Sequence, residues 1–493
     1  MGKFINKRVL IVIMVRIEDI LEQNLWWRIK EWESKDRTLS AVQNSSFRVK
    51  RKLFDYKNTV SIIYGPRQVG KTTYLKLNIK KLIENGIEPV SIAYFSCDAL
   101  LTNKREELRE AINLLLERGI KYLFIDEISN INDWSYELKN FIDSGKFDLI
   151  KVLVTGSPFG TREILPGRKV QHFFIMPSTF REFVIALSQN VNEKTQRAFN
   201  LSGAEIEEIE TLAQKLSKID FDFSDTKSLK KKLKKIDIYF FILEKLFNFY
   251  LITGGFPSLI DSYIQFKYTK NELFLSEEIK TNEERVIDSI KKAGKNEGIC
   301  FQLINSINKR LCSRYSFSQL KETEIDLSKE TIITYIDHLK KVYLVKVIYA
   351  YDFGKEEPAY KKDKKIYLID SSLYHKRKIL EEDEIRQDEE YLSKIVESIV
   401  GINLSYLKED IFTPTDSFLF FWYNSKEIDF VFKEKKTFAI EVKFRRKIDK
   451  IYKISQIKEY LVLTKKTYDL SKKEKLIPVF LFLPLLKNKE SYL

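Results

Sequence analysis

Short, mostly apolar runs alternate with helical patterns along the first half of the chain. The runs lie near residues 60, 90, 121, 150 and 171. They lack the polar alternation of a half-exposed strand, which is typical of parallel strands buried on both faces. After the first run, Tyr74, Leu75, Ile79 and Leu82 recur at helical spacing. The pattern predicts an α/β fold with helices on both faces of a parallel sheet.

A charged helical pattern over residues 188–250 interrupts this segment. Its lysine-rich stretch 227–235 is predicted to be a solvated helix face, with nucleic-acid contact as the alternative. The stretch 254–257, Gly-Gly-Phe-Pro, then breaks the helical pattern and indicates a boundary. A helical lid is predicted to follow over residues 256–295.

A winged helix-turn-helix is predicted for residues 296–375. Ser328 is a suitable N-cap for a helix that has Ile332 on its apolar face. The opposite face carries Lys329, Thr334, Lys340 and Lys341. Two strands separated by a basic loop follow this helix, as in a winged helix. Such modules contact DNA or act as spacers between protein domains, and the sequence leaves both roles open.

A phosphate-binding loop follows the first apolar run. Residues 65–72 read Gly-Pro-Arg-Gln-Val-Gly-Lys-Thr, the pattern of a P-loop between a strand and a helix. Its glycines let the backbone N–H groups wrap around phosphates. We expect Lys71 to contact the β- and γ-phosphates of ATP and Thr72 to bind Mg²⁺. The predicted nucleotide-contacting residues are Gly65, Pro66, Arg67, Gln68, Val69, Gly70, Lys71, Thr72, Thr73 and Thr155.

Two acidic residues end the third apolar run. Asp126 is predicted to hold the magnesium through water, and Glu127 to polarise the water that attacks the γ-phosphate. A solvated strand end is the alternative for an Asp-Glu pair alone. Behind a P-loop, the pair predicts hydrolysis of ATP as well as binding.

The next two runs supply further candidates for the same site. The fourth run ends in Thr155, Gly156 and Ser157, and the hydroxyls of Thr155 and Ser157 are predicted to contact the γ-phosphate or the attacking water. The alternative is a strand end capped by small residues. Arg162 and Arg168 precede the fifth run, and either could reach the γ-phosphate of its own or a neighbouring subunit. Arg168 is taken as the catalytic candidate.

A second constellation lies near the C-terminus. Period-two alternation predicts a β-hairpin that carries Asp429 on one strand and Glu441 and Lys443 on the next. Nucleases of the restriction-endonuclease type use such carboxylates to hold Mg²⁺ and the lysine to orient the nucleophile. Glu397, on the preceding helix, could complete the metal site, and the basic residues 445–447 could hold a nucleic-acid backbone. The alternative is an ordinary exposed hairpin with alternating charges.

The charge of the chain favours a polyanionic partner. Its 85 Lys and Arg against 70 Asp and Glu give a net charge of +15. Residues 443–475 hold twelve Lys or Arg against four Asp or Glu, which accounts for +8. This concentration predicts binding to nucleic acid, and DNA is the expected type. The alternative is a lysine-rich solvated surface of the thermophile kind.

The remaining composition predicts a cytoplasmic protein. Three cysteines are too few for a disulfide framework or a cysteine-rich metal site. The apolar run 9–15 is too short to span a bilayer, which needs about 20 residues. We expect no membrane contact, and Met14 is an alternative start to Met1.

Several motifs together resemble one known family. They are Gly65–Thr73, Ile125–Glu127, Thr155–Ser157, Pro177–Phe183, Gly254–Pro257, Glu427–Asp429 and Glu441–Lys443. The chain is similar to archaeal and bacterial AAA-type ATPases that carry a winged helix and a C-terminal restriction-endonuclease-like domain of unknown function. The resemblance implies ATP and Mg²⁺ at the P-loop, and it leaves nuclease activity as an expectation at candidate residues only.

The predicted fold is an α/β P-loop NTPase sheet followed by a helical lid, a winged helix and an α/β nuclease-like domain. The expected parts are an N-terminal helical segment (1–46), the ATPase domain (47–255), the lid (256–295), the winged helix (296–375) and the nuclease-like domain (380–493). The predicted function is ATP hydrolysis coupled to DNA binding, with cleavage as a further option. The alternative is an ATP-dependent switch that recruits protein partners and carries an inactive nuclease-like scaffold. A homo-oligomer is compatible with either function.

Overall fold

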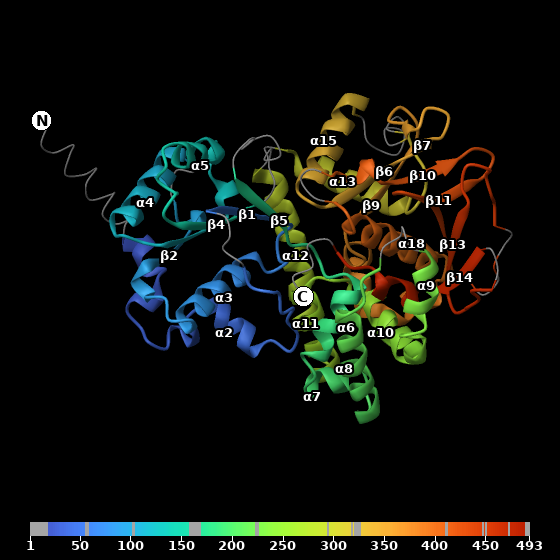
Figure 1. Ribbon diagram of the computed structural model, residues 1–493, viewed down its shortest axis with the longest axis horizontal. Coiled ribbons are helices and arrows are strands. Elements are labelled where there is room, and N and C mark those ends of the chain that lie inside the picture. Colours follow the sequence, from blue (N-terminus) through green and yellow to red (C-terminus); the bar gives the residue numbers. More distant parts are fainter. Residues whose placement is uncertain are drawn as a thin grey trace, which may run out of the picture. The chain divides into compact units, whose positions relative to one another are not determined.

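The computed structural model describes residues 18–54, 59–100, 104–156, 169–221, 226–292, 295–316, 319, 327–409, 413–445, 448, 451–471 and 474–488. These residues form two compact units (Figure 1). The first contains the described residues up to 45 and from 51 to 176, and the second contains residues 46–50 and the described residues from 177 onward. Within this described part, none of the helices has the length and apolar composition needed to cross a bilayer.

A five-stranded parallel sheet forms the centre of the first unit. Its order is β2-β3-β4-β1-β5, and every neighbouring pair is parallel. The strands are β1 (Val60–Tyr64), β2 (Ile92–Ser96), β3 (Tyr122–Asp126), β4 (Lys151–Gly156) and β5 (Val170–Phe174). Figure 1 shows α3 (Lys71–Glu84) on one face and α4 (Arg105–Glu117) and α5 (Trp134–Asp143) on the other. The predicted α/β class and all five predicted strands are confirmed.

The segment before residue 45 covers the edge strand β2. It contains the short 3₁₀ helices η1 (Leu25–Trp27) and η2 (Trp32–Ser34), followed by α2 (Arg37–Asn44). The indole N–H groups of Trp26 and Trp27 donate to the Ile92 carbonyl at 2.9 and 2.7 Å. The Asn24 side chain pairs with the N–H and C=O of Tyr94 at 2.7 and 2.9 Å. These bonds satisfy backbone groups that an edge strand leaves open.

Helices dominate the first part of the second unit. They are α6 (Phe180–Ser188), α7 (Glu193–Ala198), α8 (Gly203–Ser217), α9 (Thr226–Leu233), α10 (Phe240–Thr253), α11 (Pro257–Thr269) and α12 (Leu273–Lys292). Sequence reasoning placed residues 177–255 with the ATPase domain, but here they pack in the second unit. The Arg181 guanidinium shows why, because it is buried and donates to the carbonyls of Ile219 and Pro484 at 2.7 and 3.1 Å.

The described residues of the region predicted as a winged helix include two long helices and an antiparallel pair of strands. They are α13 (Glu297–Lys309), α15 (Lys329–Lys341), β6 (Val345–Tyr349) and β9 (Lys364–Leu368). We call the β6 and β9 pair the β6–β9 ribbon. Ser328 caps α15 through a bond to the Thr331 N–H, and Ile332 is buried, as predicted. The short pair β7 (Tyr351–Asp352) and β8 (Glu357–Pro358) lies between the ribbon strands in sequence.

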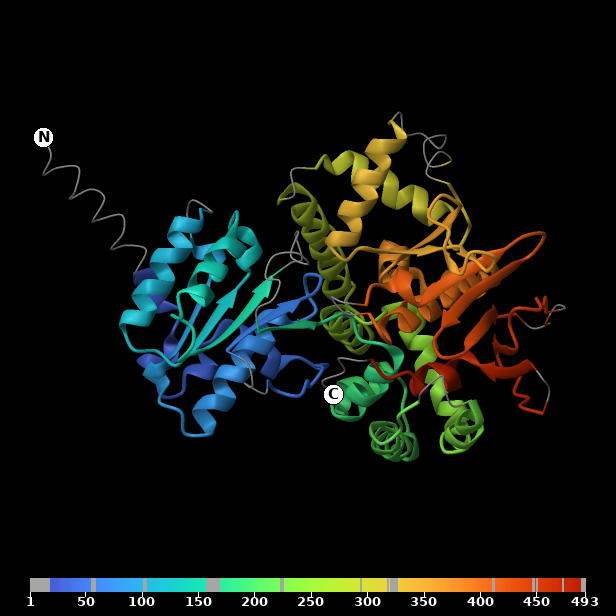
Figure 2. The same ribbon diagram turned by 45° about the horizontal axis from the view of Figure 1, so that its top comes forward.

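A mixed five-stranded sheet ends the second unit. Its strands, in spatial order, are β10 (Leu419–Tyr423), β11 (Glu427–Lys433), β12 (Thr437–Lys443), β13 (Glu459–Thr464) and β14 (Glu474–Pro478). The first two junctions are antiparallel and the last two parallel. Helix α18 (Glu389–Tyr406) packs against both β12 and the ribbon, which lies beside this sheet (Figure 2). The predicted hairpin is confirmed as β11 and β12.

A chain of hydrogen bonds links three distant segments of the second unit to the buried carboxylate of Asp370. Asp370, which follows β9, accepts a hydrogen bond from the Gly255 N–H at 2.7 Å, and burial raises the pKa of this carboxyl to about 6. The Gly255 carbonyl in turn accepts from the Ser178 N–H at 2.9 Å. Gly254 has a φ of 64°, and a Cβ there would lie 1.9 Å from Asp370 Oδ1. Only glycine fits this turn.

The substitution Gly254→Ala should therefore destabilise the second unit by at least ~3 kcal/mol, because it combines a strained φ with a clash. The matched control is Gly203→Ala, since no atom lies within 4 Å of a Cβ built at Gly203. Thermal unfolding followed by circular dichroism should show a clearly lower Tm for the first variant and little change for the second. Equal Tm values would mean that the turn at Gly254 relaxes.

Candidate functional site

The P-loop joins β1 to α3 at the carboxyl end of the parallel sheet. Gly70 has a φ of 90° and occupies the N-cap of α3, so the loop turns directly into the helix. A Cβ at Gly65 would lie 2.0 Å from the Ile175 carbonyl oxygen. The loop backbone is thus held against the segment after β5, and the free N–H groups at the helix N-terminus form the site that anions prefer.

Lys71 is buried inside this loop. Its Nζ donates to the carbonyls of Gly65 and Pro66 at 3.0 and 2.9 Å and lies 4.0 Å from Glu127 Oε1. Burial lowers the pKa of this ammonium group, while Glu127 and Asp126 oppose the shift. The lysine is therefore preorganised within the loop, where the oxygens of an anionic ligand can replace its carbonyl partners.

Asp126 is surrounded by hydroxyl groups. The Tyr94 hydroxyl donates to Oδ2 at 3.0 Å, and the Thr155 hydroxyl donates to Oδ1. Burial, followed by the charge of Glu127, raises the pKa of this carboxyl, and hydrogen bonds from hydroxyls, including that of Thr72, lower it. Thr72 and Asp126 are thus neighbours. One hydroxyl and one carboxylate form the sparse oxygen set that Mg²⁺ accepts when water and phosphate complete its shell, so these residues fit the ion.

Glu127 is fixed through its backbone. It has a φ of 50°, and its N–H donates to Thr155 Oγ1 at 3.1 Å. Its Oε2 is buried and, among the residues that the structure describes, has no hydrogen-bond partner. A general base for water requires a buried oxygen with a lone pair that no hydrogen-bond donor occupies. Thr155, predicted as a phosphate sensor, here holds both acidic residues of the strand end.

Sequence reasoning missed Tyr94, whose hydroxyl donates to Asp126, and it also missed Arg51. Arg51 lies in an irregular segment with no motif, yet its guanidinium donates to the carbonyls of Val69 and Met176 at 3.1 and 3.5 Å. It therefore braces the P-loop and links it to the segment that follows β5. The predicted candidates Ser157, Arg162 and Arg168 lie outside the described residues.

The four predicted nuclease-like residues come together in the second unit. The Val442 N–H donates to Asp429 Oδ2 at 2.8 Å, and Lys443 Nζ lies 2.8 Å from Glu441 Oε2. Burial and the charge of Asp429 raise the pKa of Glu441 to about 7. Glu397, on α18, faces the same cluster. Burial raises the pKa of its carboxyl to about 7; the charge of Lys365 opposes this shift, and the charge of Asp429 adds to it.

A lysine that the sequence analysis did not select lies inside this cluster. Lys365, on β9, is fully buried, and its Nζ lies 2.8 Å from Glu397, 2.5 Å from Glu427 and 3.8 Å from Asp429. Across the described part of the chain, no group of three or more His, Cys, Asp or Glu side chains is arranged to hold a metal ion. The predicted Mg²⁺ ligands Glu397, Asp429 and Glu441 therefore do not fit a metal in this arrangement, because an ammonium group already lies among the carboxylates.

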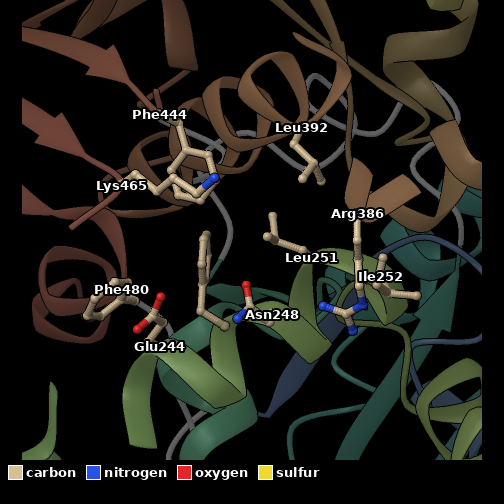
Figure 3. Close-up of a pocket in the computed structure, with 10 residues that line it drawn as sticks. Glu244, Asn248, Leu251, Ile252, Arg386, Leu392, Phe444, Lys465 and Phe480 are labelled. Atoms are coloured by element: carbon tan, nitrogen blue, oxygen red, sulfur yellow. The ribbon is translucent and has the colours of Figure 1, made fainter. Parts of the chain in front are cut away.

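A separate cavity of about 210 Å³ lies in the second unit (Figure 3). Its lining residues are Glu244, Phe247, Asn248, Leu251, Ile252, Arg386, Leu392, Phe444, Lys465 and Phe480. Arg386 and Lys465 are the cations at this cavity, and they already face Glu382 at 3.9 Å and Glu389 at 3.4 Å. The cavity thus combines apolar and aromatic side chains with charged and polar ones.

Comparison with known proteins finds two family matches within the chain. Residues 57–184 match the family described as AAA domain, and residues 244–384 match a domain of unknown function, DUF8612. The first match includes the P-loop, Asp126, Glu127 and Thr155. The match supports the predicted AAA-type P-loop domain over these residues.

Similar whole chains are distant. Uncharacterized protein MJ1544 of Methanocaldococcus jannaschii is 24% identical over 325 residues, which cover 64% of this chain and 61% of that relative. The match thus spans less than two thirds of the relative's length. RuvB of Thermotoga maritima is 15% identical and covers 58% of this chain and 81% of its own, with a TM-score of 0.27. AMPPCP-bound DnaA from Aquifex aeolicus is 12% identical and covers 62% and 86%, with a TM-score of 0.24.

The substitution Arg51→Ala should weaken ATP binding about tenfold, because it removes charge-assisted hydrogen bonds that hold the P-loop carbonyl of Val69. The matched control is Lys52→Ala, which removes a neighbouring cation whose side chain is exposed. Titration with a fluorescent ATP analogue gives both Kd values. The same loss of affinity in both variants would assign the effect to net charge and not to the brace.

Proposed function

We propose that this chain is a Mg²⁺-dependent ATPase whose nucleotide cycle is coupled to nucleic-acid binding. The observation that carries the proposal is the position of Glu127 Oε2, a buried acceptor with no described partner, on a carboxylate 4.0 Å from the P-loop lysine. Binding alone would not require such a group. Hydrolysis does, because an attacking water must lose a proton.

Each residue of the site has a distinct task in this proposal. Lys71 and the N-terminus of α3 bind the β- and γ-phosphates, and Glu127 accepts the proton of the attacking water at Oε2. Thr72 and Asp126 would hold Mg²⁺, which neutralises charge on the phosphate oxygens when bound. Thr155 positions Asp126 through its hydroxyl and Glu127 through the peptide N–H. Arg168 remains the proposed arginine that completes the site, within the subunit or from a neighbour in a homo-oligomer.

Coupling to DNA is supported by charge and by the exposed face of α15. The chain carries a net charge of +15. Lys329, Thr334 and Lys341 are exposed on α15, while its opposite face is buried. A helix with this pattern, followed by the β6–β9 ribbon, is how a winged helix presents its recognition helix to DNA.

A second candidate function is an ATP-dependent switch that recruits protein partners. One observation favours it, the burial of Lys365 among the carboxylates of the C-terminal cluster. A C-terminal domain built in this way is a scaffold, and the ATPase domain then resets a conformation without nucleic-acid chemistry. Tight partner capture by a Glu127→Gln protein in the absence of DNA would support this second function.

The nucleotide site is tested by two substitutions. Lys71→Ala should abolish ATP binding and turnover, because it removes the buried cation of the loop. Glu127→Gln should retain ATP binding and lower turnover by a factor of ~10²–10⁴, the range of general-base catalysis. Lys81→Ala, on the exposed side of α3, is the control. Steady-state phosphate release and nucleotide titration measure these effects, and a Glu127→Gln enzyme of near wild-type rate would refute the assignment of the base.

The DNA coupling is tested by charge reversal on α15. The double variant Lys329→Glu and Lys341→Glu should bind duplex DNA at least about tenfold more weakly and lose stimulation of the ATPase by DNA, with a shallower dependence on salt. Lys231→Glu with Lys235→Glu makes the same charge change on the exposed lysines of the 227–235 stretch. Equal losses in both double variants would indicate attraction by net charge alone, and an ATPase rate indifferent to DNA at low salt would favour the protein-partner switch.

A further inference from the structure

The cluster around Lys365 is a complete cation site built from this chain alone. The ammonium faces Glu397 from α18 and Glu427 and Asp429 from β11. Tyr367, two residues along β9, donates its hydroxyl to the same Glu397 oxygen at 2.9 Å. Helix α18, β11 and β9 therefore meet at one buried positive charge.

Electrostatics explains why a cation is required there. Carboxylates packed in a low-dielectric interior repel one another, and the ionised forms persist only with positive charge nearby. In a metal-dependent nuclease a divalent ion supplies that charge. Here the chain supplies it from three side chains, since Arg314 lies 2.7 Å from Glu427 and Lys443 lies 2.8 Å from Glu441, in addition to Lys365.

The backbone holds Lys365 in this position. Its strand pairs with β6 on one side, with Ile348 opposite Lys365. The preceding residue, Lys364, exchanges two backbone hydrogen bonds of 3.0 Å with Tyr315. The ladder fixes the Lys365 backbone, and the ion pairs to Glu397 and Glu427 hold its side chain. The ammonium is thus a fixed part of the cluster.

We propose that Lys365 is the resident cation of the C-terminal carboxylate site and takes the place of a divalent metal. In this arrangement the site binds no Mg²⁺ or Mn²⁺ and cleaves no phosphodiester. Its role is to lock the β6–β9 ribbon to the C-terminal sheet. Removal of the ammonium leaves Glu397, Asp429 and Glu441 without this cation, and a divalent ion then binds once their carboxylates rotate toward one another, since they are not arranged to hold a metal as they stand. This proposal rests on the second candidate function, in which the C-terminal domain is a scaffold. It is independent of ATP hydrolysis, because all of these residues lie in the second unit.

The test is Mn²⁺ binding to the full, nucleotide-free chain, measured by calorimetry. The P-loop contributes equally to every variant, so differences report on the C-terminal cluster. Lys365→Met should gain one Mn²⁺ per chain, and the added substitution Glu441→Gln should remove it. The matched control is Lys346→Met, which removes a buried lysine of the same ribbon that pairs with Glu409. This variant should gain no ion.

Two results would overturn the proposal. One is a wild-type chain that binds a Mn²⁺ ion lost in Glu441→Gln, or that cleaves DNA with Mn²⁺ in a manner lost in Asp429→Ala. The other is a folded Lys365→Met protein that gains no ion. If Lys365→Met does not fold, the comparison of wild type with Glu441→Gln still decides, since the proposal requires the two to bind Mn²⁺ equally. ATP turnover, measured on the same wild-type and Glu441→Gln samples, separates a failure of this proposal from a failure of the ATPase assignment.

Discussion

A lysine ammonium buried in protein must be surrounded by oxygen atoms, because its transfer from water is otherwise too costly. Both candidate sites follow from this constraint. In the first unit, Lys71 is held by two carbonyls of its own loop, partners that are neutral and exchangeable. In the second, Lys365 is held by carboxylates from two other elements, partners that are charged and fixed. The hydrogen bonds of the first lysine go to neutral carbonyls that an anionic ligand can replace, with Glu127 4.0 Å away, whereas the second lysine is already surrounded by carboxylates.

The local parts of the nucleotide site could be predicted from sequence. A P-loop needs a strand, two glycines, a lysine and a helix in immediate succession, so its whole geometry lies within 25 residues from Val60 to Glu84. The pair Asp126 and Glu127 could be added because the carboxyl ends of parallel strands meet at one edge of a sheet. The hairpin of β11 and β12 could also be predicted, from its period-two alternation. Its acidic residues Asp429 and Glu441 lie in one cluster.

What escaped prediction depends on contacts between distant segments. Lys365 lies 62 positions before Glu427 and directly follows four charged residues, 361–364, so nothing local distinguishes it from a solvated lysine. Arg51 precedes the P-loop in an irregular segment without periodicity. The boundary at residue 176 was hidden for the same reason, because Arg181 reaches carbonyls near Pro484, more than 300 residues away in the chain. Contacts between residues so far apart in the chain produce no local spacing pattern in the sequence.

The tryptophan-bearing segment before residue 45 has an effect on assembly. Parallel sheets of adjacent molecules can join when an open edge offers its N–H and C=O groups as a template. At β2 the side chains of Asn24, Trp26 and Trp27 already occupy groups of Ile92 and Tyr94. This chain thus carries its own cap on that edge, and strand addition across β2 is closed to a second copy or to an extended peptide.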